Sequence, residues 1–272
     1  AHWLETHEGA EVIVVPVDVH GVIDLEFLRN LVATRGDQIA VISIMHSNNE
    51  TGVLQPIEEV VSIAGSIPVH TDAVQSFKKV PLSYKDLGVT ALTLSAHKVG
   101  GPLGIGALIL RRAYEIPALL HGGGQERDRR SGTHNVAGIV GTAVALAVTD
   151  EHRNAEVTRL GALRDELVAG LTSRISCAVP TLQPGVGVAG TAHVCLDGLE
   201  SESVLYLLDT ENVCVSAASA CASGAMEPSH VLAAMNVPRS RINGSLRFSL
   251  GHTTTRDDIT KAVDATVAAA DR

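Results

Sequence analysis

The chain has 272 residues, of which 45% are hydrophobic and 19% are charged, enough for one large domain or two of ordinary size. Its formal net charge of −9, with no basic block, argues against a nucleic acid or an anionic membrane as partner. No apolar run reaches the length of a membrane span. The 4 cysteines lack Cys-x-x-Cys spacing and are too few for a disulfide framework, so we expect a reducing cytoplasm.

The first residues have the pattern of a helix already under way, which Gly9 ends. The sequence has neither an initiator methionine nor the basic, apolar and small regions of a signal peptide. We therefore expect the chain to begin inside a larger protein.

Apolar runs alternate with helical patterns over the first 110 residues. Helices are expected after Asp24, as an N-cap, and from Pro56. The expected strands cover residues 12–15, 39–44, 68–72, 90–95 and 104–110. This alternation predicts an α/β fold with a largely parallel sheet. We assign residues 1–153 to this large domain, with a soft boundary.

The pattern changes near residue 151. We expect one helix over 136–148 and a separate long amphipathic helix over about 157–171. Thr254 and Asp257 predict a capping box at the start of the last helix. The other expected elements are strands near 177–182, 192–196, 213–215 and 245–250, and short helices over 203–208 and 228–235. Residues 154–272 therefore form a smaller α+β domain.

Polar residues gather where the predicted parallel strands end, which is where ligands bind in open α/β sheets. Lys98 is the most informative, because burying an ammonium is costly unless a Schiff base or a partner neutralises it. The alternative, that Lys98 simply reaches water at the strand end, stays open on this stretch alone. The residues at or just past the strand ends are Asn49, Asp72, Gln75, Ser95, His97 and Lys98.

Residues 122–133 form a glycine-rich, charged loop before a helix. Its backbone N–H groups, an arginine and Thr133 could seat a phosphate. The alternative is an exposed loop whose arginines pair with Glu126 and Asp128, and taken alone the loop favours this alternative.

Cys221 lies in a segment of small residues, 215–225, which we expect to be mobile and to expose a reactive thiol. The other three cysteines, Cys177, Cys195 and Cys214, lie in or beside strand-like runs and are expected to be small hydrophobes. Three histidines that could be read as metal ligands share no ligand spacing, so we expect structural roles and no metal site for His46, His70 and His121.

Six motifs, in this order and spacing, resemble the signature of cysteine desulfurases, more closely the NifS/IscS-like group of the class V aminotransferase family. They are Asp72-Ala73-Val74-Gln75-Ser76, Ser95-Ala96-His97-Lys98, His121-Gly122-Gly123-Gly124-Gln125-Glu126, Arg130-Ser131-Gly132-Thr133, Ser219-Ala220-Cys221 and Ser245-Leu246-Arg247-Phe248-Ser249. The resemblance implies pyridoxal 5′-phosphate (PLP), a fold-type I homodimer, and conversion of L-cysteine to L-alanine. The sulfur would be left as an enzyme persulfide and passed to an acceptor such as an iron–sulfur scaffold protein, for cluster assembly or thio-modification.

The resemblance also implies roles for individual residues. Lys98 would bind the cofactor as a Schiff base and then move the α-proton, while Asp72 would hold the proton on the ring nitrogen. Cys221 would attack the substrate sulfur as a thiolate. Gln75 and Asn49 would lie near the phenolic oxygen and the substrate.

Two further ligand-binding sets follow from the same resemblance. Ser95, His97 and Thr133 match the phosphate-binding residues, with Thr133 reaching across from the other subunit. Arg247 matches the clamp for the substrate carboxylate, where its planar fork suits two-point binding.

The chain departs from the family at its start. Family members carry an N-terminal Gly/Ala-Thr turn that cradles the phosphate and a histidine that stacks on the pyridoxal ring, and this sequence contains neither motif. Two alternatives therefore stay open: another class V reaction, such as transamination or selenocysteine lysis, and a folded remnant without cofactor or activity.

Overall fold

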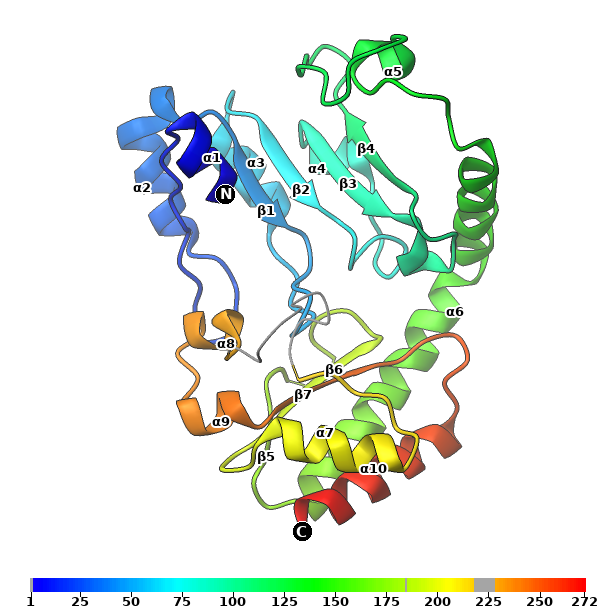
Figure 1. The fold of residues 1–272 in the computed structure, drawn as a ribbon. Coiled ribbons are helices and arrows are strands. Elements are labelled where there is room, and N and C mark those ends of the chain that lie inside the picture. The colour runs from blue at the N-terminus through cyan, green and yellow to red at the C-terminus, as the bar shows by residue number, and fades with distance from the viewer. Residues whose placement is uncertain (1, 184, 218–227) are drawn as a thin grey trace.

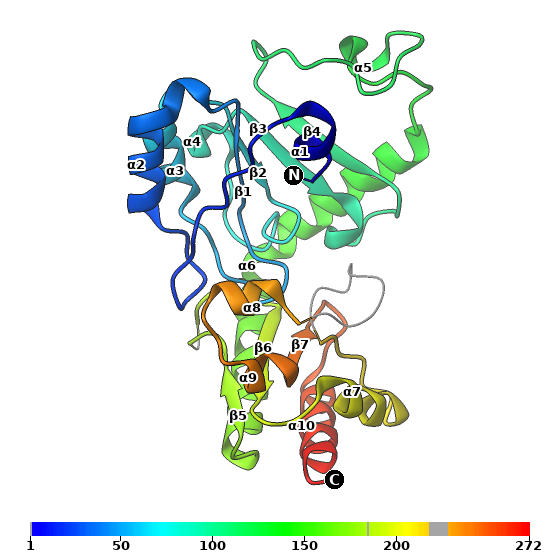
Figure 2. The ribbon, with the colours of Figure 1, turned by 60° about the vertical axis from the view of Figure 1, so that its left-hand side comes forward.

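The computed structural model describes residues 2–183, 185–217 and 228–272. They form an upper and a lower part, joined by one long helix (Figures 1 and 2). The elements of the upper part are α1 (His2–Glu8), α2 (Leu25–Arg35), η1 (Gly36–Gln38), β1 (Ile42–Met45), α3 (Ile57–Ala64), β2 (Val69–Asp72), α4 (Tyr84–Leu87), β3 (Ala91–Ser95), η2 (Ala96–Val99), β4 (Gly106–Leu110) and α5 (Gln125–Asp128). The long helix is α6 (Val136–Arg174). The lower part contains β5 (Ala178–Pro180), β6 (Thr191–Leu196), α7 (Ser201–Thr210), α8 (His230–Ala234), α9 (Arg239–Asn243), β7 (Ser245–Ser249) and α10 (Arg256–Ala270).

The upper sheet has the order β1-β2-β3-β4. β1, β2 and β3 are parallel, and β4 runs antiparallel to β3 at one edge, so the prediction of a largely parallel sheet is confirmed. Helices α2 and α3 pack together over one face, where Leu28, Val60 and Leu92 are among the most buried side chains. The carboxyl ends of the three parallel strands consequently meet at one edge.

The lower sheet is antiparallel, with β6 between β5 and β7. One face packs against α6, α7 and α10 through a core that includes Leu171, Leu208 and Leu246. The other face carries a smaller cluster, in which Cys195 on β6 meets Leu232 and Ile242 from α8 and α9. This covering on both faces explains why five consecutive residues of β6, 192–196, are buried.

Contacts between the two parts cluster at the loop that follows β1. The backbone N–H of Val188 donates to the carbonyl of Gly52 at 3.0 Å. Ser229 donates to the buried carboxylate of Glu50 at 2.5 Å. The lower domain is thereby held against the carboxyl edge of the parallel strands.

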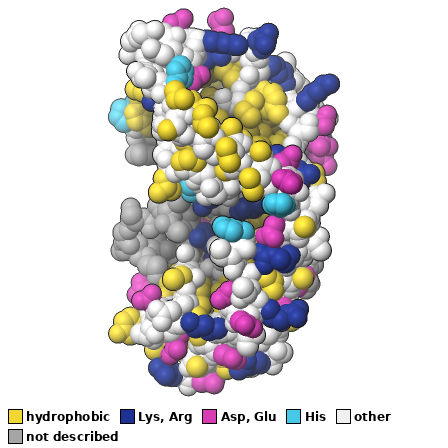
Figure 3. Space-filling view, turned by 90° about the vertical axis from the view of Figure 1, so that its right-hand side faces the viewer, with side chains coloured by type: hydrophobic (Ala, Val, Ile, Leu, Met, Phe, Trp, Pro, Cys, Tyr) yellow, Lys and Arg dark blue, Asp and Glu magenta, His cyan; other side chains and the backbone are white. Residues whose placement is uncertain are grey.

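Helix α6 corrects the expectation of two helices over 136–148 and 157–171. Residues 149–156 contain neither glycine nor proline, so nothing interrupts the backbone hydrogen bonds and one helix runs through. The predicted domain boundary at 153 falls inside this helix. An exposed apolar stripe lies along its first half, and the upper half of Figure 3 shows a broad hydrophobic area on this side. The stripe contains Val136, Ile139, Val140, Val144 and Val148.

Three smaller expectations were wrong. Residues 12–15 are not a strand, because no neighbouring strand pairs with them and Val14 is 80% exposed. Residues 213–215 likewise form no strand, and only Ser216 bridges to β7. The capping box is made by Thr255 and Asp258, one residue later than predicted. Among the described helices, none combines the length and hydropathy that a membrane span requires.

Candidate functional site

The polar residues predicted at the strand ends do share one edge of the upper sheet. Asn49 lies in the turn after β1, Asp72 is the last residue of β2, and Ser95 is the last residue of β3. His97 and Lys98 follow at once in the short helix η2. Parallel register aligns Asp72 with Met45 of β1 on one side and with Thr93 of β3 on the other. The polar residues that follow β1, β2 and β3 therefore lie side by side.

Asp72 and Gln75 are held by the turn that leaves β2. An oxygen of the Asp72 carboxylate accepts from the backbone N–H of Val74 at 2.8 Å, which fixes its orientation. Three residues later, Gln75 accepts through Oε1 from the ammonium of Lys79 at 3.3 Å. Both side chains are half-buried, so a bound ligand can reach them.

Ser95 and His97 contact each other at the end of β3. The Ser95 hydroxyl and Nδ1 of His97 are 2.7 Å apart, and the imidazole is exposed. A hydroxyl and an imidazole two residues apart can both donate hydrogen bonds to one anion. The arrangement suits the phosphate-binding role that the resemblance implies.

A cavity of about 700 Å³ lies beside Lys98, between the end of η2, the middle of α6 and the loop after β7. Its wall includes Val99 at the end of η2, Gly100 just after it, Val148 from α6, and Leu250 after β7. The Lys98 side chain is only half-buried. It therefore reaches both solvent and a space large enough for a cofactor-sized molecule.

Arg247, in the middle of β7, brings the lower sheet to this edge. Its Nη1 donates to the carbonyl of Asn49 at 2.9 Å, and its Nη2 lies 3.5 Å from the Ser216 hydroxyl. The structure thus brings together Arg247 and Asn49, the two residues predicted to bind substrate. These two residues are separated by 198 positions in the sequence.

His193 lies directly opposite Arg247 in the β6–β7 register, so their side chains share one face of the sheet. Its Nδ1 is 2.6 Å from the Thr181 hydroxyl. Burial, and secondarily the charge of Arg247, lowers the pKa of His193 to about 4. The imidazole is therefore neutral at physiological pH and adds no second charge beside the guanidinium.

Thr133 is not part of this cluster within one chain. It is exposed on the connection that leads from α5 to α6. In the same loop Glu126 pairs with His134 at 3.2 Å, and no described arginine pairs with it or with Asp128. The loop is exposed as expected, but its predicted arginine pairs are wrong. Residues 126–128 have left-handed backbone. That Thr133 serves a partner subunit stays a prediction.

The cysteines divide by environment. Cys195 is buried on β6, and burial raises the pKa of its thiol to about 11, so it is an inert hydrophobe. Cys177 is half-buried. Cys214 is exposed, contrary to expectation, because the strand predicted around it does not form. Cys221 lies outside the described residues, as do residues 218–225 of the predicted mobile segment 215–225.

His46 and His70 have structural partners. Nδ1 of His46 is 2.9 Å from the Ser76 hydroxyl. His70 lies between Ser43 and Thr93, at 2.8 and 3.2 Å. Burial lowers the pKa of both histidines, and these contacts confirm the structural roles. His121 is exposed. Across the described ranges, no group of three or more His, Cys, Asp and Glu side chains could hold a metal ion.

Lys79 is the functional candidate that sequence reasoning missed. It lines the same cavity as Lys98. Burial lowers its pKa to about 8, and the charges of Lys98 and Arg247 contribute further. The only signal in the sequence was a pair of lysines, 78 and 79, shortly after the Asp72–Ser76 motif. A lysine pair is usually a solvated surface feature.

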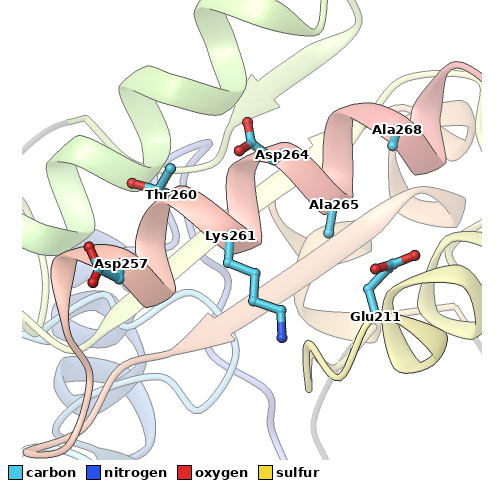
Figure 4. A pocket seen from close by; sticks show the side chains of 7 residues that line it. All are labelled: Glu211, Asp257, Thr260, Lys261, Asp264, Ala265 and Ala268. Atoms are coloured by element: carbon cyan, nitrogen blue, oxygen red, sulfur yellow. The ribbon is translucent and has the colours of Figure 1, made fainter.

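A second open groove, of about 600 Å³, lies on the outer side of the lower domain between the end of α7 and α10. Figure 4 shows Lys261 and Glu211 on opposite sides of the gap, with Asp257 and Asp264 along the helix. Figure 1 places α7 and α10 away from the carboxyl edge of β1–β3. This groove is therefore separate from the cluster around Lys98.

Comparison with known proteins gives a consistent result. The family model described as "Aminotransferase class-V" matches residues 1–262. The IscS-like cysteine desulfurase of Mycobacterium tuberculosis is 41% identical over 267 residues, covering 97% of this chain and 67% of the relative. The cysteine desulfurase NifS of Azotobacter vinelandii is 42% identical over 258 residues, covering 94% and 63% respectively.

The fold agrees with these relatives. The structure of a NifS-like protein from Rickettsia africae superposes with a TM-score of 0.90 at 31% identity, covering 99% of this chain and 72% of that one. The chain spans about two thirds of the length of the curated relatives it matches. The expected PLP fold type I architecture, with part of the family fold absent from this chain, is thereby confirmed.

Proposed function

This chain belongs to the class V aminotransferase family, and from that premise we propose that it is a cysteine desulfurase. It would convert L-cysteine to L-alanine and leave the sulfur on Cys221 as a persulfide. The observation that carries the proposal is the contact between Arg247 and Asn49. It joins Arg247 on the lower sheet, the side chain proposed to bind the substrate carboxylate, to the edge of the upper sheet that carries Lys98.

The residues present fit PLP. A half-buried amine, Lys98, faces a cavity of about 700 Å³, and Asp72 ends the neighbouring strand. Ser95 and His97 offer donors for a phosphate at the same edge. Enzymes of this family are PLP-dependent, and PLP, when bound, acts as an electron sink for the α-carbon of an amino acid.

The chain's own residues would divide the work as follows. Lys98 holds the cofactor and then carries a proton to and from the substrate α-carbon, and Asp72 retains a proton on the ring nitrogen. Arg247 binds the substrate carboxylate through two N–H groups. The Cys221 thiolate forms an S–S bond with the substrate sulfur as the Cβ–S bond breaks, which leaves the carbon skeleton as L-alanine once Cβ has gained a proton.

We propose that the working unit is a homodimer. The exposed apolar stripe on α6 (Figure 3) is the kind of surface that soluble proteins cover by association. Thr133 is exposed and lies just before this stripe, so a second copy could receive it as a phosphate ligand. Sedimentation of the chain should then give twice the mass of 28.4 kDa.

The persulfide would be handed to an acceptor protein, such as an iron–sulfur scaffold, for cluster assembly or thio-modification. A reducing cytoplasm is the proposed setting, because the reaction depends on a thiolate. The similarity to an IscS-like and a NifS cysteine desulfurase supports the proposed role in sulfur transfer.

The decisive experiment adds PLP to the purified chain and follows its visible absorbance and sulfide release from L-cysteine. We expect a yellow protein that Lys98→Ala prevents, and sulfide release that Cys221→Ser abolishes. Turnover unchanged by Cys221→Ser would favour transamination or selenocysteine lysis. A chain that stays colourless with added PLP would reject cofactor binding, and with it the proposed function.

A further inference from the structure

The turn after β2 places Lys79 by means of a strained residue. Lys78 has a positive φ of 62°, a conformation that favours glycine and is uncommon for a lysine. The Lys78 ammonium pairs with Asp150 of α6 at 2.6 Å. The backbone N–H of Lys79 in turn donates to the carbonyl of Ser76 at 2.9 Å. The turn is thereby anchored on both sides, and Lys79 is directed into the cavity.

The ammonium of Lys79 is held without a negative charge. It donates to Gln75 Oε1 at 3.3 Å, and in the described parts of the chain no carboxylate lies within 4.0 Å of it. Its neighbour Lys78 does have such a partner. A half-buried ammonium near two other cations is costly, and the pKa of Lys79, lowered to about 8 by burial and by Lys98 and Arg247, reflects that cost.

The cavity as a whole is positive, although the chain is acidic. The other titratable side chains on its wall are Lys78, Lys98, His152, Arg153, Glu156 and His252. Glu156 is the one carboxylate among these lining residues, and Arg159 already holds it at 2.9 Å. A cleft with this charge concentrates anions from solution.

We propose that Lys79 is an anion-binding residue of this cavity, and that its ligand is a carboxylate or a phosphate group of the molecule bound beside Lys98. An anion there would supply the missing countercharge and hydrogen-bond acceptor. The identity of the ligand rests on the proposed function, whereas the presence of an anion site does not. A carboxylate would come from the amino-acid substrate and a phosphate from the cofactor.

Competitive acetylation of lysines, read by mass spectrometry, tests the site in the full chain without cofactor. Labelling of Lys79 is measured from pH 6.5 to 9.5 in chloride, inorganic phosphate or propionate at equal ionic strength. We expect the apparent pKa of Lys79 to rise by about one unit, a tenfold preference for the charged form, in phosphate or in propionate. Exposed Lys85, labelled in the same sample, is the matched reference. An equal response of Lys79 and Lys85 would overturn the proposal.

Variants of the PLP-treated chain give the second readout. Lys79→Met should weaken PLP binding or raise KM for L-cysteine about three- to tenfold, according to which anion protected Lys79. Lys79→Arg, which keeps the charge, should stay within twofold of the parent, and Lys85→Met should change neither quantity. Unchanged values in Lys79→Met would count against the proposal even if labelling were affected.

These outcomes separate the anion site from the proposed function. Anion protection of Lys79 in a chain that neither binds PLP nor releases sulfide would leave the site standing and reject the function. Sulfide release that Lys79→Met does not change, together with no anion protection of Lys79, would support the proposed function and reject the anion site.

Discussion

The guanidinium of Arg247 donates to the main-chain oxygen of Asn49 across 2.9 Å, and so joins β7 of the lower sheet to the loop after β1 of the upper sheet. This contact holds β7 against the loop after β1, and a second nitrogen, Nη2, lies 3.5 Å from the Ser216 hydroxyl. We propose that the same guanidinium binds the substrate carboxylate, because its planar fork suits two-point binding.

Replacing Arg247 with lysine should mainly impair substrate binding. Lysine keeps the charge but lacks the planar fork, so two-point binding of a carboxylate is lost. We expect KM for L-cysteine to rise about 10- to 100-fold, the equivalent of one charge-assisted hydrogen bond, with a smaller change in kcat. Steady-state kinetics checks this. Arg256→Lys, at an exposed ion pair with Glu166, is the control, and equal effects in both variants would refute the role.

Gly187→Ala should loosen the junction between the two parts of the molecule. Gly187 has a φ of +78°, and an added Cβ would lie 2.7 Å from the carbonyl oxygen of Gly52. Gly185 has the same φ with open space around it. Both alanine variants should lose about 1 kcal/mol for the left-handed backbone, and Gly187→Ala a further 1–3 kcal/mol, roughly, for the clash. Urea unfolding measures the difference, and equal losses would contradict it.

Much of the candidate site could be predicted because it depends on local patterns. Apolar runs ending in polar residues predicted Asp72, Ser95 and Lys98 at one edge, since parallel strands align their carboxyl ends. The pairing of Arg247 with Asn49 was reachable only through the resemblance to a family, because no local pattern relates residues on different sheets.

The incorrect expectations have two different physical causes. Residues 12–15 have strand propensity, but a strand needs a partner and none is adjacent. The position of Lys79 in the cavity depends on the left-handed backbone at Lys78, and a lysine in the sequence does not predict that conformation. For these two the surrounding fold decided the outcome. Helix α6 is the opposite case, because local helix propensity continues through residues 149–156, where two separate helices were expected.

Stability should fall with acid because of His193. Its pKa is about 4 in the folded chain, against an ordinary value of 6.5, so between these values the unfolded chain binds the proton and the folded chain does not. The free energy of unfolding should therefore decrease as pH falls from 6.5 to 4, by up to about 3 kcal/mol, with no contribution above pH 6.5. His46 and His70 add to the same trend.

Substitution isolates the contribution of His193. His193→Asn removes the titrating group, so the difference in unfolding free energy between pH 7.5 and 4.5 should shrink relative to the parent chain. His20→Asn, at an exposed histidine, should leave that difference unchanged. A parent chain whose stability is the same at both pH values would rule out the mechanism.

Ser229→Ala should cost more than the loss of a helix cap. The Ser229 hydroxyl accepts from the backbone N–H of Leu232 at 3.1 Å, as the N-cap of α8, and donates to buried Glu50 at 2.5 Å. Ser83 caps α4 at an exposed position, accepting from Asp86 at 3.3 Å, and is the matched control. Each alanine variant should lose about 1 kcal/mol for the cap. Ser229→Ala should lose roughly a further 1.5–3 kcal/mol, because a buried carboxylate loses a donor. Chemical denaturation gives both values. If the two losses were equal, the contact with Glu50 would contribute nothing to holding the lower domain on the loop after β1.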